Sequence, residues 1–290
     1  MLIRAEGLEF YLASALLPQR KRPFTWALYG FARYTDEIVD SAAQPVEMRK
    51  ARLDAWKDAV EAGLRSGESQ SPVLHALLHT MERWDIPSSH VHDYLASQEM
   101  DLTVRHYPTY GDLRRFIELA SMSFGRQMLP VFEPLDAALA RQGGDAISEA
   151  MQLTNIIRDI RQDFELGRVY LPLEDLDACG VRPQDLAGAD VTPQMRAVVA
   201  RQVARARDLL VTAESQEAAL HSTSRRAVRA VHVIYGALLD EVERRGFDVF
   251  TSRVRLTPRQ KAGTATSALV GQFNLRRANG GCHSDNDRIC

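Results

Sequence analysis

Residues 152–163 read QLTNIIRDIRQD, an apolar segment that nevertheless carries acidic residues at helical spacing. On a helix, Asp159 and Asp163 project from one face about 5 to 6 Å apart. Asn155 extends the same row by one turn. This segment therefore predicts a helix with a row of oxygen ligands on a face that would otherwise be apolar.

A second segment, residues 28–40, repeats the pattern with the sequence LYGFARYTDEIVD. Asp36 and Asp40 are again one turn apart, and Arg33 lies about one turn before them. Like charges this close repel one another unless the face is solvated or cations lie across it. The two rows are therefore either solvated helix faces or two halves of a cation site.

The rest of the chain predicts helices as well. Apolar residues recur at helical spacing almost throughout, and alternating strand patterns are hardly seen. Prolines and the Gly143–Gly144 pair are expected breakers that divide the chain into segments of about 12 to 30 residues. We expect an all-α, single-domain bundle of roughly eight to ten helices with a central apolar cavity. The domain should span residues 1–275, with a disordered polar tail over residues 276–290.

Composition excludes several classes of function. The 290 residues are 45% hydrophobic and carry a net charge of −2, so no general attraction to nucleic acid is expected. Three scattered cysteines without CxxC spacing indicate neither a disulfide framework nor a zinc site. No apolar run is long enough to span a membrane. We expect a cytoplasmic protein that could still touch a membrane through one face, and the oligomeric state stays open.

Two facing rows of carboxylates have a definite chemical use. Mg²⁺ takes oxygen ligands, keeps several waters and commonly bridges carboxylates to substrate phosphates. A diphosphate held by such ions becomes a good leaving group, because the metals neutralise the charge that develops as the C–O bond breaks. The wall between the rows should then be apolar and dry, since water would quench an allylic cation.

One acidic pair alone is weak support for this chemistry. With 38 acids in the chain, about five pairs at i, i+4 are expected by composition. Each row taken by itself is more often a solvated face. The two rows gain weight from their shared spacing, from Arg33 and Asn155 one turn before each pair, and from their apolar surroundings.

The residues also carry a family pattern. Residues 152–172, QLTNIIRDIRQDFELGRVYLP, closely resemble the second signature of squalene/phytoene synthases, and residues 28–40 resemble the first. Weaker similarities place the resemblance over about residues 9 to 262. It implies an isoprenoid synthase fold, and it implies a site whose metal ligands are Asp36, Asp40, Asn155, Asp159 and Asp163.

The resemblance also implies roles for other residues. Arg33 would hold a diphosphate oxygen, and the catalytic set would be the four aspartates of the two rows with Arg33 and Tyr235. The substrate-binding set would be Arg33, Gln152, Asn155, Arg158, Arg168, Tyr235 and Phe10. For Gln152, Arg168 and Tyr235, hydrogen bonding within a helical core is an equally good interpretation.

The reaction that the resemblance implies is head-to-head condensation of two prenyl diphosphates. Two molecules of geranylgeranyl diphosphate would give phytoene through a cyclopropylcarbinyl diphosphate, with release of diphosphate. Mg²⁺ would be the cofactor, with Mn²⁺ as a substitute, and we expect no use of NADPH. Substrate chain length stays open. Candidates for setting it are the bulky residues Phe24, Phe31, Phe116, Met122 and Phe124.

Two departures from the family pattern leave an alternative. The run Glu6–Phe10 has Leu8 and Glu9 where the family carries a basic and hydroxyl cluster, and only Arg4 could compensate. Phe116 stands where the family has a tyrosine, and Glu118 stands at a usually uncharged position. A terpene cyclase or single-ionisation prenyltransferase on the same scaffold is therefore the alternative. A third hypothesis is a helical scaffold that has lost the chemistry.

Overall fold

The fold is known from a computed structural model that describes residues 8–41, 44–187, 191–257 and 260. Over these residues the α-helices are α1 (Leu8–Ser14), α2 (Arg22–Val39), α3 (Val46–Ser66), α4 (Pro72–Trp84), α5 (Ser88–Thr103), α6 (Tyr110–Ile117), α7 (Ser123–Met128), α8 (Ala137–Glu165), α9 (Leu173–Ala178), α10 (Pro193–Ser215) and α11 (Ser222–Arg244). The described residues form no strand and only two isolated β-bridges, and none of their helices is long and apolar enough to cross a bilayer.

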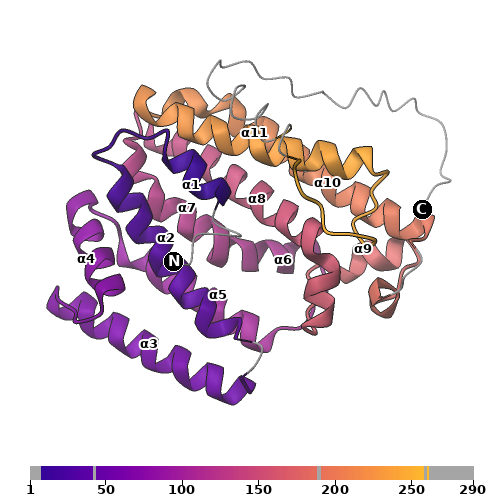
Figure 1. The fold of residues 1–290 in the computed structure, drawn as a ribbon, viewed down its shortest axis with the longest axis horizontal. Coiled ribbons are helices and arrows are strands. Elements are labelled where there is room, and N and C mark those ends of the chain that lie inside the picture. The colour runs from indigo at the N-terminus through magenta and orange to yellow at the C-terminus, as the bar shows by residue number, and fades with distance from the viewer. Residues whose placement is uncertain (1–7, 42–43, 188–190, 258–259, 261–290) are drawn as a thin grey trace.

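Helices α6, α7, α10 and α11 pack against α8, the longest helix (Figure 1). In that view, α10 and α11 run along one long side of the molecule, and α3 lies along the opposite side. The prediction of an all-α bundle is confirmed. The described part contains eleven α-helices rather than eight to ten, partly because the π-helical turn Glu118–Met122 divides α6 from α7.

The glycine pair at 143–144 does not break a helix, contrary to the prediction. Both glycines lie inside α8. A Cβ on Gly143 would come within 3.0 Å of the Gln216 side chain and 3.6 Å of the Ala213 carbonyl oxygen. The missing side chain lets α10 approach α8 closely. Tertiary packing thus outweighs the low intrinsic helix propensity of glycine.

The ends of α8 follow from local sequence. Asp136 caps its N-terminus, where its carboxylate accepts hydrogen bonds of 3.0 Å from the amides of Ala138 and Leu139. Beyond its C-terminus, Gly167 adopts a φ of +76°, in the left-handed region that glycine tolerates best. The Arg168 amide then donates to the Asp163 carbonyl at 2.8 Å. This turn brings Arg168 back toward the last turn of α8.

The hydrophobic core has two main parts. One joins α2 through α5 with α7, and it includes Phe31, Leu53 and Leu77, each with no exposed surface. The other joins α6, α8, α9, α10 and α11 with the segment that follows α11. Burial of these apolar faces holds the helices in the arrangement that brings α2, α5 and α8 to a common site.

Candidate active site

The row on α2 lies at the C-terminal end of that helix. Asp36 is half-buried, and the Tyr94 hydroxyl on α5 lies 2.6 Å from its Oδ1. Asp40 is the C-cap residue of α2, and its amide donates to the Asp36 carbonyl. The Asp40 side chain is 55% exposed, so an ion from solvent can reach it.

The three members of the row on α8 differ in their hydrogen-bond partners. Asp159 accepts hydrogen bonds from two guanidinium groups, those of Arg158 and Arg253, at 2.7 to 3.2 Å. Asp163 is one turn further and faces several other acids. Asn155 Oδ1 is buried and accepts no hydrogen bond within the described part of the chain.

Arg168 connects the two rows. Its Nη1 lies 3.3 Å from Asp40 Oδ1 on α2, and its backbone amide donates a hydrogen bond to the Asp163 carbonyl on α8. The charge of Arg168 also opposes the rise that burial causes in the pKa values of Asp163 and Asp101. Only 8% of the Arg168 surface is exposed. The structure thus brings the rows from residues 36–40 and 155–163 to one place around this arginine.

A third wall of the site comes from α5, which sequence reasoning missed. Tyr94 and Asp101 lie seven residues apart on one face of α5. Asp101 accepts a hydrogen bond of 2.6 Å from the Tyr170 hydroxyl. The available signal was the rule that found the other rows, namely polar residues on an otherwise apolar helix face. Arg253 was also missed, because nothing local to it indicates a partner.

Burial and mutual repulsion perturb the acids of this site. Burial raises the pKa of Asp36 to about 7, with Asp40 and Asp101 adding to the effect against Tyr94 and Arg33. Burial, Asp159, Asp101 and Asp40 together raise the pKa of Asp163 to about 7 against the charge of Arg168.

The pKa values of Asp101 and Asp159 are shifted in opposite directions. Burial raises the pKa of Asp101 to about 6, although Arg168 and Tyr170 oppose it. Burial would also raise the pKa of Asp159, but its hydrogen bonds to Arg158 and Arg253 outweigh that effect and hold the pKa below its usual value. Proton affinity is thus highest where cations are fewest, as expected for groups that repel one another.

The donor set fits a divalent cation. The unpaired Asn155 Oδ1 and the raised pKa values of Asp36 and Asp163 mark oxygens that lack positive charge. Carboxylate and amide oxygens are ligands that Mg²⁺ accepts. Within the described ranges no three acidic, histidine or cysteine side chains already form a metal cluster.

The other predicted residues each have their own local contacts. Arg33 Nε is 3.6 Å from Glu37 Oε1 and is partly exposed. Gln152 is half-buried on α8, on the face of Asn155. Tyr235 is half-buried on α11 and packs against the core. Phe10 stacks on Tyr29 with ring centroids 4.4 Å apart.

An apolar cavity begins one turn from Asn155 and about two turns from Asp159, the first acid of the row on α8. It has an empty volume of about 960 Å³, including the part open to solvent, and it is lined by residues of α1, α2, α7, α8, α10 and α11. On α8 the lining runs from Ala140 to Met151, about 16 Å of helix, and Met151 precedes Asn155 by about 6 Å. Of the residues proposed to set chain length, only Phe124 lines it. Phe10 lies in its wall too.

The polar residues in the cavity wall are neutral or paired. Burial lowers the pKa of His232 to about 4, so this side chain is uncharged at neutral pH. Glu217 forms an ion pair with Arg229. The cavity therefore offers a long hydrophobic chain a surface with little free charge.

The sequence model of the squalene/phytoene synthase family matches residues 3–260. This chain belongs to that family. The 15-cis-phytoene synthase of Synechococcus elongatus is 33% identical over 272 residues, covering 90% of this chain and 88% of that protein. The phytoene synthase of Thermus thermophilus is 34% identical over 260 residues, covering 90% and 87%. A dehydrosqualene synthase crystallised with a ligand has the same fold, with a TM-score of 0.85 at 24% identity over 93% of both chains.

Membership of the squalene/phytoene synthase family makes this protein a prenyltransferase that joins prenyl diphosphates head to head. The family uses a divalent metal to bind diphosphate. The hypothesis of a scaffold without chemistry is therefore wrong, and the cyclase alternative is not favoured.

The departures from the squalene/phytoene synthase pattern have structural explanations in part. Phe116 lies 2% exposed between Tyr107 and Tyr170, with centroids 5.6 and 5.5 Å away, and does not line the cavity. Phe116 is thus not part of the wall that a chain bound there would contact. Glu118 forms a 3.1 Å ion pair with Arg126. Arg4 and the side chains of Leu8 and Glu9 lie outside the described residues.

Proposed function

We propose that this protein condenses two molecules of geranylgeranyl diphosphate to phytoene with Mg²⁺ as its cofactor, and that Mn²⁺ can replace Mg²⁺. One observation carries the proposal: acids from α2, α5 and α8 converge around Arg168, and the acidic row on α8 begins about two helical turns beyond the wall of an apolar cavity on the same helix. The curated relatives at 33–34% identity are phytoene synthases, which favours the C20 substrate. Formation of phytoene needs no reductant.

The metal ligands in this proposal are Asp36 and Asp40 on α2 and Asn155, Asp159 and Asp163 on α8. Mg²⁺ held there supplies charge neutralisation for the diphosphate as it leaves. The protein contributes by keeping two helices in register, so that ligands from both sides meet one diphosphate. Asp101 adds negative charge behind the first row and strengthens the attraction for cations.

The cationic residues would hold the diphosphate itself. Arg168 is suited to this role because its Nε is buried and donates no hydrogen bond within the described residues. Arg33 and Arg158 would bind phosphate oxygens from either side, while Gln152 and Tyr235 would orient them. A guanidinium can donate two parallel hydrogen bonds to one phosphate.

The cavity would determine what happens to the allylic carbocation that forms when diphosphate leaves. One substrate loses diphosphate, and the 2,3-double bond of the second attacks its C1, with loss of a proton, to form a cyclopropylcarbinyl diphosphate. Loss of the second diphosphate and rearrangement would yield the C40 product, and a released diphosphate could accept the last proton. Phe10, Phe124 and the apolar face of α8 would exclude water that would otherwise trap these cations.

Product analysis tests this function directly. Purified protein with Mg²⁺ and geranylgeranyl diphosphate should yield a C40 hydrocarbon with a central conjugated triene, and farnesyl diphosphate should be a poorer substrate. A product with a single prenyl unit would support the cyclase alternative. A C30 product formed faster than the C40 product would reject the chain length proposed here.

A peripheral membrane contact is part of the same proposal, because the product is too apolar for water. Tyr11 and Trp26 form an exposed stacked pair, 44% and 41% accessible, with ring centroids 6.1 Å apart. Trp26 Nε1 donates to Ser14 Oγ in the cavity wall at 3.0 Å. Tyrosine and tryptophan favour membrane interfaces. Binding to vesicles should fall when Trp26 is replaced by Ser.

A further inference from the structure

Asp159, a proposed metal ligand, is already neutralised by cations of the protein. Arg253 approaches it with both arms of its fork, Nε to Oδ1 at 2.7 Å and Nη2 to Oδ2 at 3.0 Å. Arg158 adds a second guanidinium, with Nη2 to Oδ2 at 2.7 Å. Both carboxylate oxygens of Asp159 are thus engaged by guanidinium groups.

Arg253 reaches Asp159 from a segment far away in the sequence. After α11 the chain reverses through Gly246 and Phe247, both with positive φ values of 58° and 62°. The following segment is bound to the core by the buried side chains of Phe250, Val254 and Leu256. The position of Arg253 is therefore set by how this segment lies on α8 and α11.

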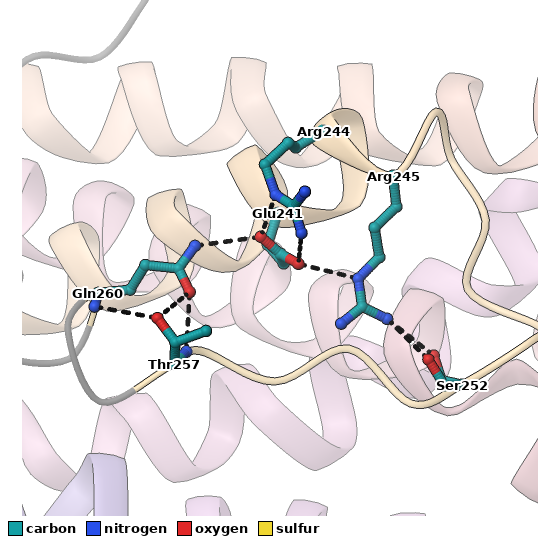
Figure 2. A network of polar contacts seen from close by, with 6 residues as sticks. All are labelled: Glu241, Arg244, Arg245, Ser252, Thr257 and Gln260. Atoms are coloured by element: carbon teal, nitrogen blue, oxygen red, sulfur yellow. Dashed lines mark hydrogen bonds and ion pairs between the residues drawn. The ribbon is translucent and has the colours of Figure 1, made fainter.

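Glu241 anchors that segment to α11 (Figure 2). This glutamate is 2% exposed, and its carboxylate accepts from Arg244 at 2.8 and 2.5 Å and from Arg245 Nε at 2.9 Å. It also accepts from Gln260 Nε2 at 3.1 Å. Arg245 in turn donates at 3.1 Å to both the carbonyl and the hydroxyl of Ser252, the residue before Arg253.

We propose that Arg253 is an internal counter-ion that must leave Asp159 before a metal binds there, and that Glu241 is the positioning residue that holds Arg253 in this place. The proposal rests on the proposed function, since it takes Asp159 as a metal ligand. In the free enzyme, Arg253 stabilises the partly buried carboxylate of Asp159. A metal ion must compete with two charge-assisted hydrogen bonds, so free metal binds weakly.

The proposal predicts the sign of an affinity change that a purely structural role would not produce. Replacing Arg253 by Gln removes the competitor, so Mg²⁺ should bind more tightly in the absence of substrate, by roughly fivefold to tenfold, or up to about 1.4 kcal/mol. Arg255→Gln is the matched control, because Arg255 is exposed on the same segment and carries the same charge. Its Mg²⁺ affinity should change less than about twofold.

Calorimetric titration of the full-length protein with Mg²⁺ alone, at pH 8, measures both variants. Tighter binding by Arg253→Gln but not by Arg255→Gln supports the proposal. Equal affinities in the two variants, or weaker binding by Arg253→Gln, overturn it. Circular dichroism checks that helical content is unchanged.

The role of Glu241 is tested through Arg253. Glu241→Gln should tighten Mg²⁺ binding by a smaller factor in the natural background and should have no further effect in the Arg253→Gln background. The same factor in both backgrounds, or no change in either, would show that Glu241 does not act through Arg253. Gln260→Ala, which removes one contact to Glu241, serves the same test if Glu241→Gln does not fold.

One further variant separates failure of this inference from failure of the proposed metal site. Asp159→Asn should weaken Mg²⁺ binding strongly with Arg253 present or absent. If Asp159→Asn binds Mg²⁺ as the natural protein does, the metal assignment itself is wrong. If Asp159→Asn abolishes binding while Arg253→Gln changes nothing, only the counter-ion proposal is wrong.

Discussion

Replacing Asp163 by Asn should stabilise the metal-free protein while it abolishes activity. The pKa of Asp163 is raised from 3.8 to about 7, a difference of about 3 units, by burial and by neighbouring acids. At 1.36 kcal/mol per unit, ionising this group in the folded state costs at most about 4 kcal/mol above pH 7. Relaxation and partial solvent contact reduce this figure, so we expect a gain of about 1 to 2 kcal/mol, or about 2 to 6 °C in Tm.

The size of this stabilisation depends on pH. Between pH 3.8 and about 7 the folded protein holds a proton on Asp163 that the unfolded chain has lost, so this group makes the natural protein less stable as pH rises. The Asn variant has no such loss of stability as pH rises. Its advantage should be less than half as large at pH 5 as at pH 7.5.

Thermal unfolding in EDTA at the two pH values measures the prediction. Glu165→Gln is the control, because Glu165 lies on the same helix with a 66% exposed side chain and should change stability by less than about 0.5 kcal/mol. An Asp163→Asn variant that is less stable than the natural protein at pH 7.5 would refute the reasoning. So would a gain of equal size at pH 5.

Three other predictions follow from the site and the cavity. Asp36→Ala should lower turnover by orders of magnitude without loss of helical content by circular dichroism, and unchanged turnover would remove it from the metal site. Mg²⁺ binding near pH 6.5 should release protons from Asp36 and Asp163, whose pKa values are about 7, so the heat of binding should vary with the buffer and cease to vary above about pH 8.5. A Cβ on Gly144 would enter open space in the cavity, so Gly144→Leu should lower turnover of C20 relative to C15 diphosphate by at least about tenfold, as product mass analysis would show.

The helical class and both acidic rows could be predicted from sequence because they depend on local spacing. Residues four apart share a helix face whatever surrounds the helix, so the sequence places Asp36 one turn from Asp40 and Asp159 one turn from Asp163. The Gly143–Gly144 pair was misread for the same reason. Its local propensity predicts a break, while its tertiary neighbour α10 requires a small residue there.

The sequence by itself determined which side chains share a face of each helix and to which family the chain belongs. Only the tertiary structure decided which faces meet. It brought Tyr94 and Asp101 on α5 beside the first row, and it placed Arg253 on Asp159 across 94 residues of chain. The physical reason is that contacts between distant segments follow from the burial of the whole core, which no local period encodes.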